Sequence, residues 1–166
     1  MNLRPLLIGL VAGQQSMTPL AAVALAARSR GLARDNGAPA VLGRRSVAAG
    51  ASVLAIGEMV GDKLRSAPDR TVLPGLVARL VTGGVVGAAL CPRRSRGSAA
   101  ALGAAGAVLG SYAGLAVRRR AMRRFGQTRS GLIEDLLTLA ATTLILRAGR
   151  ASSAQNPIQE RPGRSR

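Results

Sequence analysis

Aromatic residues, histidine and cysteine are scarce in this chain, and each shortage excludes a class of protein. Aromatic residues make up 1% of the 166 residues, histidine is absent, and Cys91 is the single cysteine. Without histidine, neither Ser-His-Asp or Cys-His catalysis nor a histidine-ligated metal centre can form. One cysteine permits no intramolecular disulfide. A soluble core of this size normally packs large aromatic rings, so their shortage also argues against an ordinary soluble domain.

Acidic residues are few as well, with 24 Lys+Arg against 7 Asp+Glu and a formal net charge of +17. Such a charge is typical of proteins that bind nucleic acid or an anionic membrane surface. Proteins that bind single strands add stacking aromatic residues, which are almost missing here. The arginines also lie between apolar blocks rather than along one face. We therefore expect a lipid bilayer as the partner, and no nucleic acid.

Enzymatic signatures are missing too. The chain has no Gly-x-x-x-x-Gly-Lys-Ser/Thr phosphate loop and no Gly-x-Ser-x-Gly motif. We expect no catalytic residues, no cofactor and no resident metal. Carboxylate-only binding of Mg²⁺ or Ca²⁺ remains an alternative, since the chain has acidic residues next to its apolar blocks.

The apolar blocks are rich in Ala, Leu, Val and Gly, and they alternate with basic stretches. This pattern predicts an all-α fold, a polytopic transmembrane helical bundle of four to five spans in the cell inner (plasma) membrane. One domain is expected over 1–147, and a basic, disordered tail over 148–166. The expected helical segments cover about 3–27, 46–61, 71–91, 98–117 and 131–146.

The charges of the loops predict their side of the membrane. Basic loops over 28–45 and 92–96 are expected in the cytoplasm, and the nearly neutral loop over 62–70 outside. A third basic loop, expected over 118–129, conflicts with this rule if segment 98–117 crosses once. That segment or the first one is therefore a candidate for a re-entrant helix, unless one loop ignores the charge rule.

Polar residues and Pro19 interrupt the first segment, which we expect to be broken. Interrupted spans are typical of transporters. A kinked helix, or two half-helices that do not cross, would account for the same residues. The polar residues of the break are Gln14, Gln15, Ser16 and Thr18.

Ionisable residues mark the ends or interior of three other segments, and charge within a span is a functional hypothesis by default. We expect these residues and the polar break to surround one cavity of a transporter or channel-like protein, whose substrate or ion the sequence does not name. The alternative is a structural or scaffold membrane protein in which the same charges only form salt bridges. The ionisable candidates are Glu58, Asp62, Lys63, Arg79, Glu134 and Asp135.

Glycines recur every fourth residue along several segments, and small residues at this spacing allow helices to pack closely in lipid. They suit both internal packing and a homo-oligomer. The glycines expected at helix contacts are Gly57, Gly61, Gly83, Gly87, Gly106, Gly110 and Gly114.

Four of these features together resemble a bacterial integral-membrane family catalogued as domain of unknown function forty-one twenty-six. The resemblance covers about 3–146 and departs from the family pattern at Leu64-Arg65, where Leu/Ile-Pro is expected. It implies a small multi-span membrane protein and no particular activity. The residues that carry it are Ser16-Met17-Thr18-Pro19-Leu20, Gly57-Glu58-x-x-x-Asp62-Lys63-Leu64, Arg79 and Glu134-Asp135.

Overall fold

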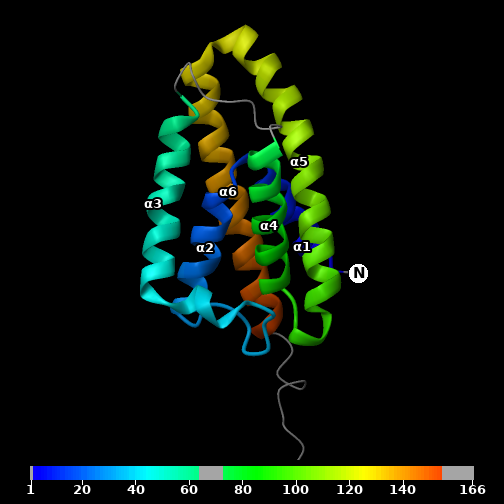
Figure 1. The fold of residues 1–166 in the computed structure, drawn as a ribbon. Coiled ribbons are helices and arrows are strands. Elements are labelled where there is room, and N and C mark those ends of the chain that lie inside the picture. The colour runs from blue at the N-terminus through cyan, green and yellow to red at the C-terminus, as the bar shows by residue number, and fades with distance from the viewer. Residues whose placement is uncertain (1, 64–72, 155–166) are drawn as a thin grey trace, which may run out of the picture.

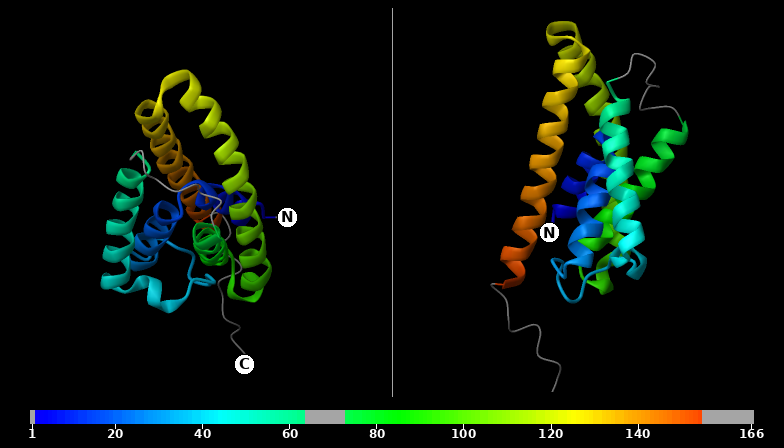
Figure 2. Two further views of the ribbon diagram at one scale, coloured as in Figure 1. Left: turned by 45° about the horizontal axis from the view of Figure 1, so that its top comes forward. Right: turned by 90° about the vertical axis from the view of Figure 1, so that its left-hand side faces the viewer.

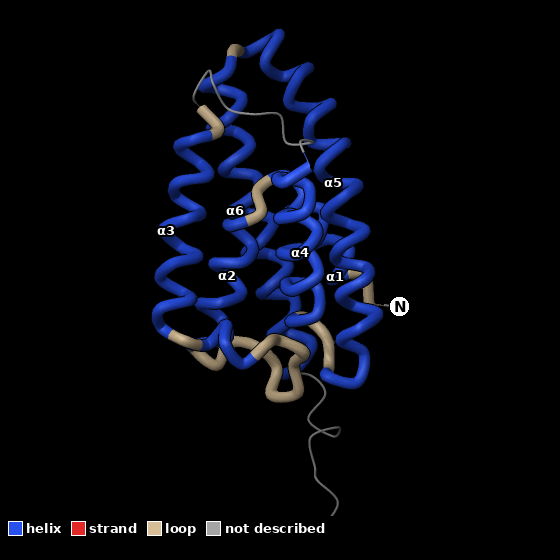
Figure 3. Tube along the Cα trace, in the orientation of Figure 1, coloured by secondary structure: helices blue, strands red, loops and turns tan. Residues whose placement is uncertain are grey.

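A computed structural model describes residues 2–63 and 73–154, and every regular element within them is helical. The helices form one bundle, in which α1 packs beside α5 and α2 packs beside α3 (Figures 1 and 3). The predicted all-α class is confirmed. The elements are α1 (Arg4–Gln14), α2 (Met17–Arg28), η1 (Ala40–Gly43), α3 (Arg45–Gly61), α4 (Leu73–Ala89), η2 (Arg93–Ser95), α5 (Arg96–Phe125) and α6 (Gln127–Ala154).

The first segment folds back on itself, and we call α1 and α2 together the hairpin. Helix α1 begins beside the C-terminal part of α6, where Arg4 Nη2 donates to the carbonyl oxygen of Ala148 at 2.9 Å. The chain after α2 returns to the same place, where Arg150 Nε donates to the carbonyl oxygen of Gly31 at 2.9 Å. The first segment is therefore two half-helices rather than one kinked span.

The two helices of the hairpin have 11 and 12 residues. At about 1.5 Å per residue each is about 17 Å long, roughly half of a hydrocarbon core. Prolines fit near their N-termini because a missing N–H costs nothing in the first turn. The tip of the hairpin thus lies inside the bundle, where α6 continues past it (Figure 2).

Glycines bring α1, α4 and α5 together backbone to backbone. A Cβ on Gly103 would lie 2.2 Å from the carbonyl oxygen of Gly83, and a Cβ on Gly110 would lie 2.2 Å from that of Leu10. The structure also places Gly106 against Leu6, Gly87 against Ala99, and Gly114 against the side chain of Gln14.

Gly57 and Gly61 of α3, which were also expected at helix contacts, face open space. A Cβ on Gly57 or Gly61 would have no atom within 4 Å, so neither glycine packs against another helix within residues 2–63 and 73–154, contrary to the prediction. Helix α3 instead contacts the hairpin through an alanine face that contains Ala51 and Ala55. A homo-oligomer that uses the open glycines stays a prediction.

The ends of α5 and α6 differ from the sequence prediction. Residues 118–129 do not form a loop, because α5 continues to Phe125 and α6 begins at Gln127. Gly126, with φ +78°, is the single residue between them. Helix α6 also continues to Ala154, past the expected end of the segment at about residue 146. The domain boundary at residue 147 stays a prediction, and residues 155–166 lie outside the described part. The expected outer loop over 62–70 is described only at Asp62 and Lys63.

Large aliphatic side chains lie on the surface of the bundle, and polar side chains lie in its interior beside the apolar core. Val53, Val117 and Leu136 are 67–68% exposed, while Gln15 and Ser111 are fully buried. By length and composition, one helical stretch in the described residues, Arg93–Phe125, is able to cross a membrane. The count of four to five spans stays a prediction.

Candidate functional site

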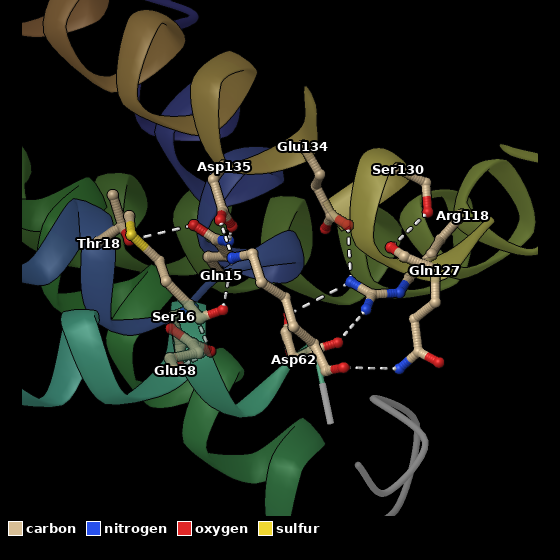
Figure 4. Close-up of polar contacts among 12 residues, drawn as sticks. Gln15, Ser16, Thr18, Glu58, Asp62, Arg118, Gln127, Ser130, Glu134 and Asp135 are labelled. Carbon is tan, nitrogen blue, oxygen red and sulfur yellow. Dashed lines mark hydrogen bonds and ion pairs between the residues drawn. The ribbon is translucent and has the colours of Figure 1, made fainter. Parts of the chain in front are cut away.

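Polar and charged side chains from five helices meet around the tip of the hairpin (Figure 4). They come from the tip itself, the C-terminal end of α3, the middle of α4, and α5 and α6 near their junction. We call this set the tip network. Its members are Gln15, Ser16, Thr18, Glu58, Asp62, Lys63, Arg79, Arg118, Glu134 and Asp135.

Glu58 binds the N-terminus of α2. One carboxylate oxygen accepts from the backbone N–H and the hydroxyl of Ser16 at 3.0 and 3.1 Å, and the other accepts from the backbone N–H of Met17 at 2.8 Å. The first N–H groups of a helix have no acceptor within it, and the helix dipole favours an anion there. Glu58 therefore caps α2 from a neighbouring helix and holds the hairpin tip to α3.

The same carboxylate faces a buried arginine of α4. Arg79 Nη2 lies 3.7 Å from Glu58 Oε1, and the Arg79 side chain is 9% exposed. The sequence analysis names Glu58 and Arg79 as candidates for one site, and this contact brings them together. A buried charge is costly without a counter-charge, so the Arg79–Glu58 pair should hold α4 against the tip of the hairpin.

Asp135 of α6 lies between the hairpin and α3. One of its oxygens accepts from the Gln15 carboxamide, and the other forms an ion pair with Lys63. The network continues on the hairpin, where Thr18 Oγ1 donates to Gln15 Oε1 at 3.2 Å. Lys63 Nζ also donates to the carbonyl oxygen of Met59 at 2.7 Å, where the C-terminal end of α3 favours a cation.

Arg118 of α5 joins Asp62, at the end of α3, to Glu134 of α6. The sequence analysis missed Arg118 because it assigned this residue to a loop. Its Nη1 lies 2.9 Å from Glu134 Oε2 and 3.4 Å from Asp62 Oδ2, and its Nη2 donates to the carbonyl oxygen of Asp62. A signal was present in the sequence. Arg118 continues the four-residue spacing of Gly110 and Gly114, so it faces the bundle as they do.

The adjacent residues Glu134 and Asp135 bind different partners, Arg118 for the first and Lys63 with Gln15 for the second. Consecutive helical residues are about 100° apart, so Glu134 faces α5 and Asp135 faces the hairpin. Gln14 is not part of the tip network, because its side chain packs against Gly114 of α5. The buried Ser111, also absent from the sequence prediction, donates to the carbonyl oxygen of Gly13 at 3.1 Å and so satisfies the end of α1.

The chemistry of the tip network is that of carboxylates held by cations and amides. Each of its four carboxylates lies within ion-pair distance of a lysine or an arginine. In the part of the chain that the structure describes, no three His, Cys, Asp or Glu side chains are grouped to hold a metal ion.

Comparison with known proteins identifies no relative. No family model, no curated protein and no solved structure matches the chain. The family resemblance drawn from the motifs around Glu58 and Glu134 stays a prediction, and the function is argued from the site itself.

Cys91 lies away from the tip network, in the turn between α4 and α5, and is 7% exposed. Burial raises the pKa of its thiol, an effect that Arg4 and the Asn2 side chain only partly oppose. The folded state therefore favours the neutral thiol, whereas the unfolded chain loses this proton at a lower pH. The free energy of unfolding should fall as pH rises from the unfolded pKa through the raised folded pKa.

We expect N-ethylmaleimide to label Cys91 about tenfold more slowly in the folded protein than in SDS-unfolded protein at neutral pH, because the thiolate is the nucleophile. The pH midpoint of the labelling rate should also be higher in the folded protein. Stopped aliquots analysed by intact mass give both quantities. Equal rates in the two states would contradict the buried position of Cys91.

Proposed function

We propose that the chain is a multi-span integral membrane protein of the cell inner membrane. The support is the large amount of aliphatic surface that the bundle exposes. Side chains such as Val53, Val117 and Leu136 are two-thirds exposed, although the bundle also has a buried apolar core. Exposed apolar surface of this extent is typical of contact with lipid, where small residues pack the helices together.

We further propose that it is a transporter or channel-like protein, and that a proton or small monovalent cation is handled at the tip network. One observation carries this proposal: two half-helices end inside the bundle at the Lys63–Asp135 ion pair, with the buried Gln15 beside it. Non-helical backbone at membrane depth is tolerated where protein or a water-filled cavity covers it. Broken helices with ionisable groups at the break are typical of transport sites.

A scaffold protein is the second candidate, and the pairing of the charges favours it. Glu58 caps α2 and pairs with Arg79, while Arg118 bridges Asp62 and Glu134. Such contacts hold helices in register even if nothing is transported. The two candidates differ in whether the wild-type chain conducts an ion.

Ion flux in proteoliposomes tests the proposal. We expect the full chain to conduct H⁺, Na⁺ or K⁺ above protein-free vesicles, with Asp135→Asn lowering the flux by about tenfold or more because the intramembrane carboxylate is lost. Asp35→Asn, the same substitution in an exposed loop, is the matched control and should leave the flux unchanged. A pH-sensitive dye and ion-selective electrodes measure the three ions.

The exchanged pair Lys63→Asp with Asp135→Lys tests whether Asp135→Asn lowers the flux through lost stability or through the loss of the carboxylate. The exchange keeps an ion pair between α3 and α6, so it should recover much of the stability that Asp135→Asn loses. For a transport site the flux should stay low, since Gln15 would then face an ammonium group. Wild-type flux of all three ions at the level of empty vesicles would reject transport and leave the scaffold.

A further inference from the structure

An open groove lies on the outside of the bundle between α2 and α6, away from the tip network. Its volume is about 480 Å³. Its apolar wall includes Ala22 and Leu25 of α2 and Leu146 of α6. Arg28 and Arg150 line the same groove where α2 ends. The groove is therefore apolar along its wall and cationic at one end.

Arg150 is held in place at this end. Its Nε donates to the carbonyl oxygen of Gly31 at 2.9 Å, and within the described residues its Nη groups have no acceptor. A Cβ on Gly31 would lie 2.2 Å from Arg150 Nη2, so the guanidinium occupies the space that the absent side chain leaves. A fixed guanidinium loses little freedom when it binds a phosphate.

We propose that this groove binds an anionic glycerophospholipid of the surrounding leaflet. An acyl chain lies along Leu25 and Leu146, and the phosphate lies between Arg28 and Arg150. Two guanidinium groups complement a phosphate in charge and in geometry, and basic pockets beside membrane helices select anionic headgroups. The inference rests on the proposed membrane location but not on transport.

Native mass spectrometry of the purified full chain in detergent tests the proposal. With matched acyl chains, phosphatidylglycerol should bind about tenfold better than phosphatidylcholine, and Arg28→Gln with Arg150→Gln should remove that preference. Arg44→Gln with Arg45→Gln removes the same charge from exposed residues at the start of α3 and should keep it. An equal loss in this control would mean non-specific attraction and overturn the site.

Gly31→Ala is the sharper variant because it leaves the net charge unchanged. The added methyl displaces the Arg150 guanidinium, and we expect phosphatidylglycerol binding to fall several-fold. Binding equal to that of the wild type would overturn the proposal. Inorganic phosphate at millimolar concentration should not displace the lipid; displacement by phosphate would assign the arginines to a free anion instead.

Alkaline carbonate extraction of cell membranes separates this proposal from the proposed function. If the chain is released without detergent, the membrane location fails and the lipid site fails with it. If the chain stays in the membrane but shows no preference for phosphatidylglycerol, only the lipid site fails. Ion flux through the Arg28→Gln and Arg150→Gln protein tests transport separately, because neither the extraction result nor the lipid preference depends on transport.

Discussion

Gly103→Ala should lower the free energy of unfolding by about 3 kcal/mol, near the upper end of what overpacking costs. The new Cβ would lie 2.2 Å from the carbonyl oxygen of Gly83 and 3.0 Å from the Cα of Gly87. Both are backbone atoms of α4, so no side chain can rotate away. The clash is relieved only if α4 and α5 move apart, which also loosens α1 because Gly9 packs on Gly103.

The matched control is Gly57→Ala on α3. It is the same substitution inside a helix, at a position where a Cβ meets no atom within 4 Å. Alanine favours a helix over glycine by up to about 1 kcal/mol, so this variant should be as stable as the wild type or more so. SDS-induced unfolding of detergent-purified protein, followed by circular dichroism, compares the two. A Gly103→Ala protein as stable as the control would contradict the close packing of α4 on α5.

Arg118→Gln should be the most damaging single change in the tip network, with a loss of about 3 kcal/mol, the range measured when one partner of a buried ion pair is removed. The Arg118 side chain is 10% exposed, and Asp62 and Glu134 are 18% and 12% exposed. The substitution takes the guanidinium from both carboxylates and from the carbonyl oxygen of Asp62. The junction of α5 and α6 should then separate from the end of α3.

Hydrogen exchange localises this effect. We expect faster exchange in α3 near Asp62 and in the first turns of α6, with less change in the hairpin. Glu134→Gln added to Arg118→Gln should cost less than the sum of the two single changes, because both remove the same ion pair. Arg120→Gln, on the exposed side of α5, is the control and should leave exchange unchanged. Equal effects of Arg118→Gln and Arg120→Gln would mean that Arg118 does not bridge the helices.

The sequence predicts much of the tip network because burying charge is costly whatever the fold. Glu58, Arg79 and Asp135 each lie in or next to an apolar block, so each needs a partner, and the structure supplies one. Arg118 was missed since a run of arginines is typical of a loop. Its inward position depends on helix α5 continuing to Phe125, which the glycine spacing before it only suggests.

The packing glycines show where sequence spacing is not enough. Gly57 and Gly61 have the same four-residue spacing as Gly106 and Gly110, yet only the second pair lies against another helix. The spacing defines a smooth stripe on one helix. Whether that stripe is covered depends on which neighbour lies beside it, and α3 contacts the hairpin through its alanine face instead.

The sequence by itself determined the helical class, the position of the polar break, and the absence of histidine-based chemistry. These follow from apolar block length, from Pro19 and its polar neighbours, and from composition, which are local properties of the chain. The tertiary structure alone decided that α1 and α2 fold back as a hairpin and that Arg118 joins Asp62 to Glu134. Such contacts link residues far apart in the sequence, and their formation depends on how the helices bury one another's faces.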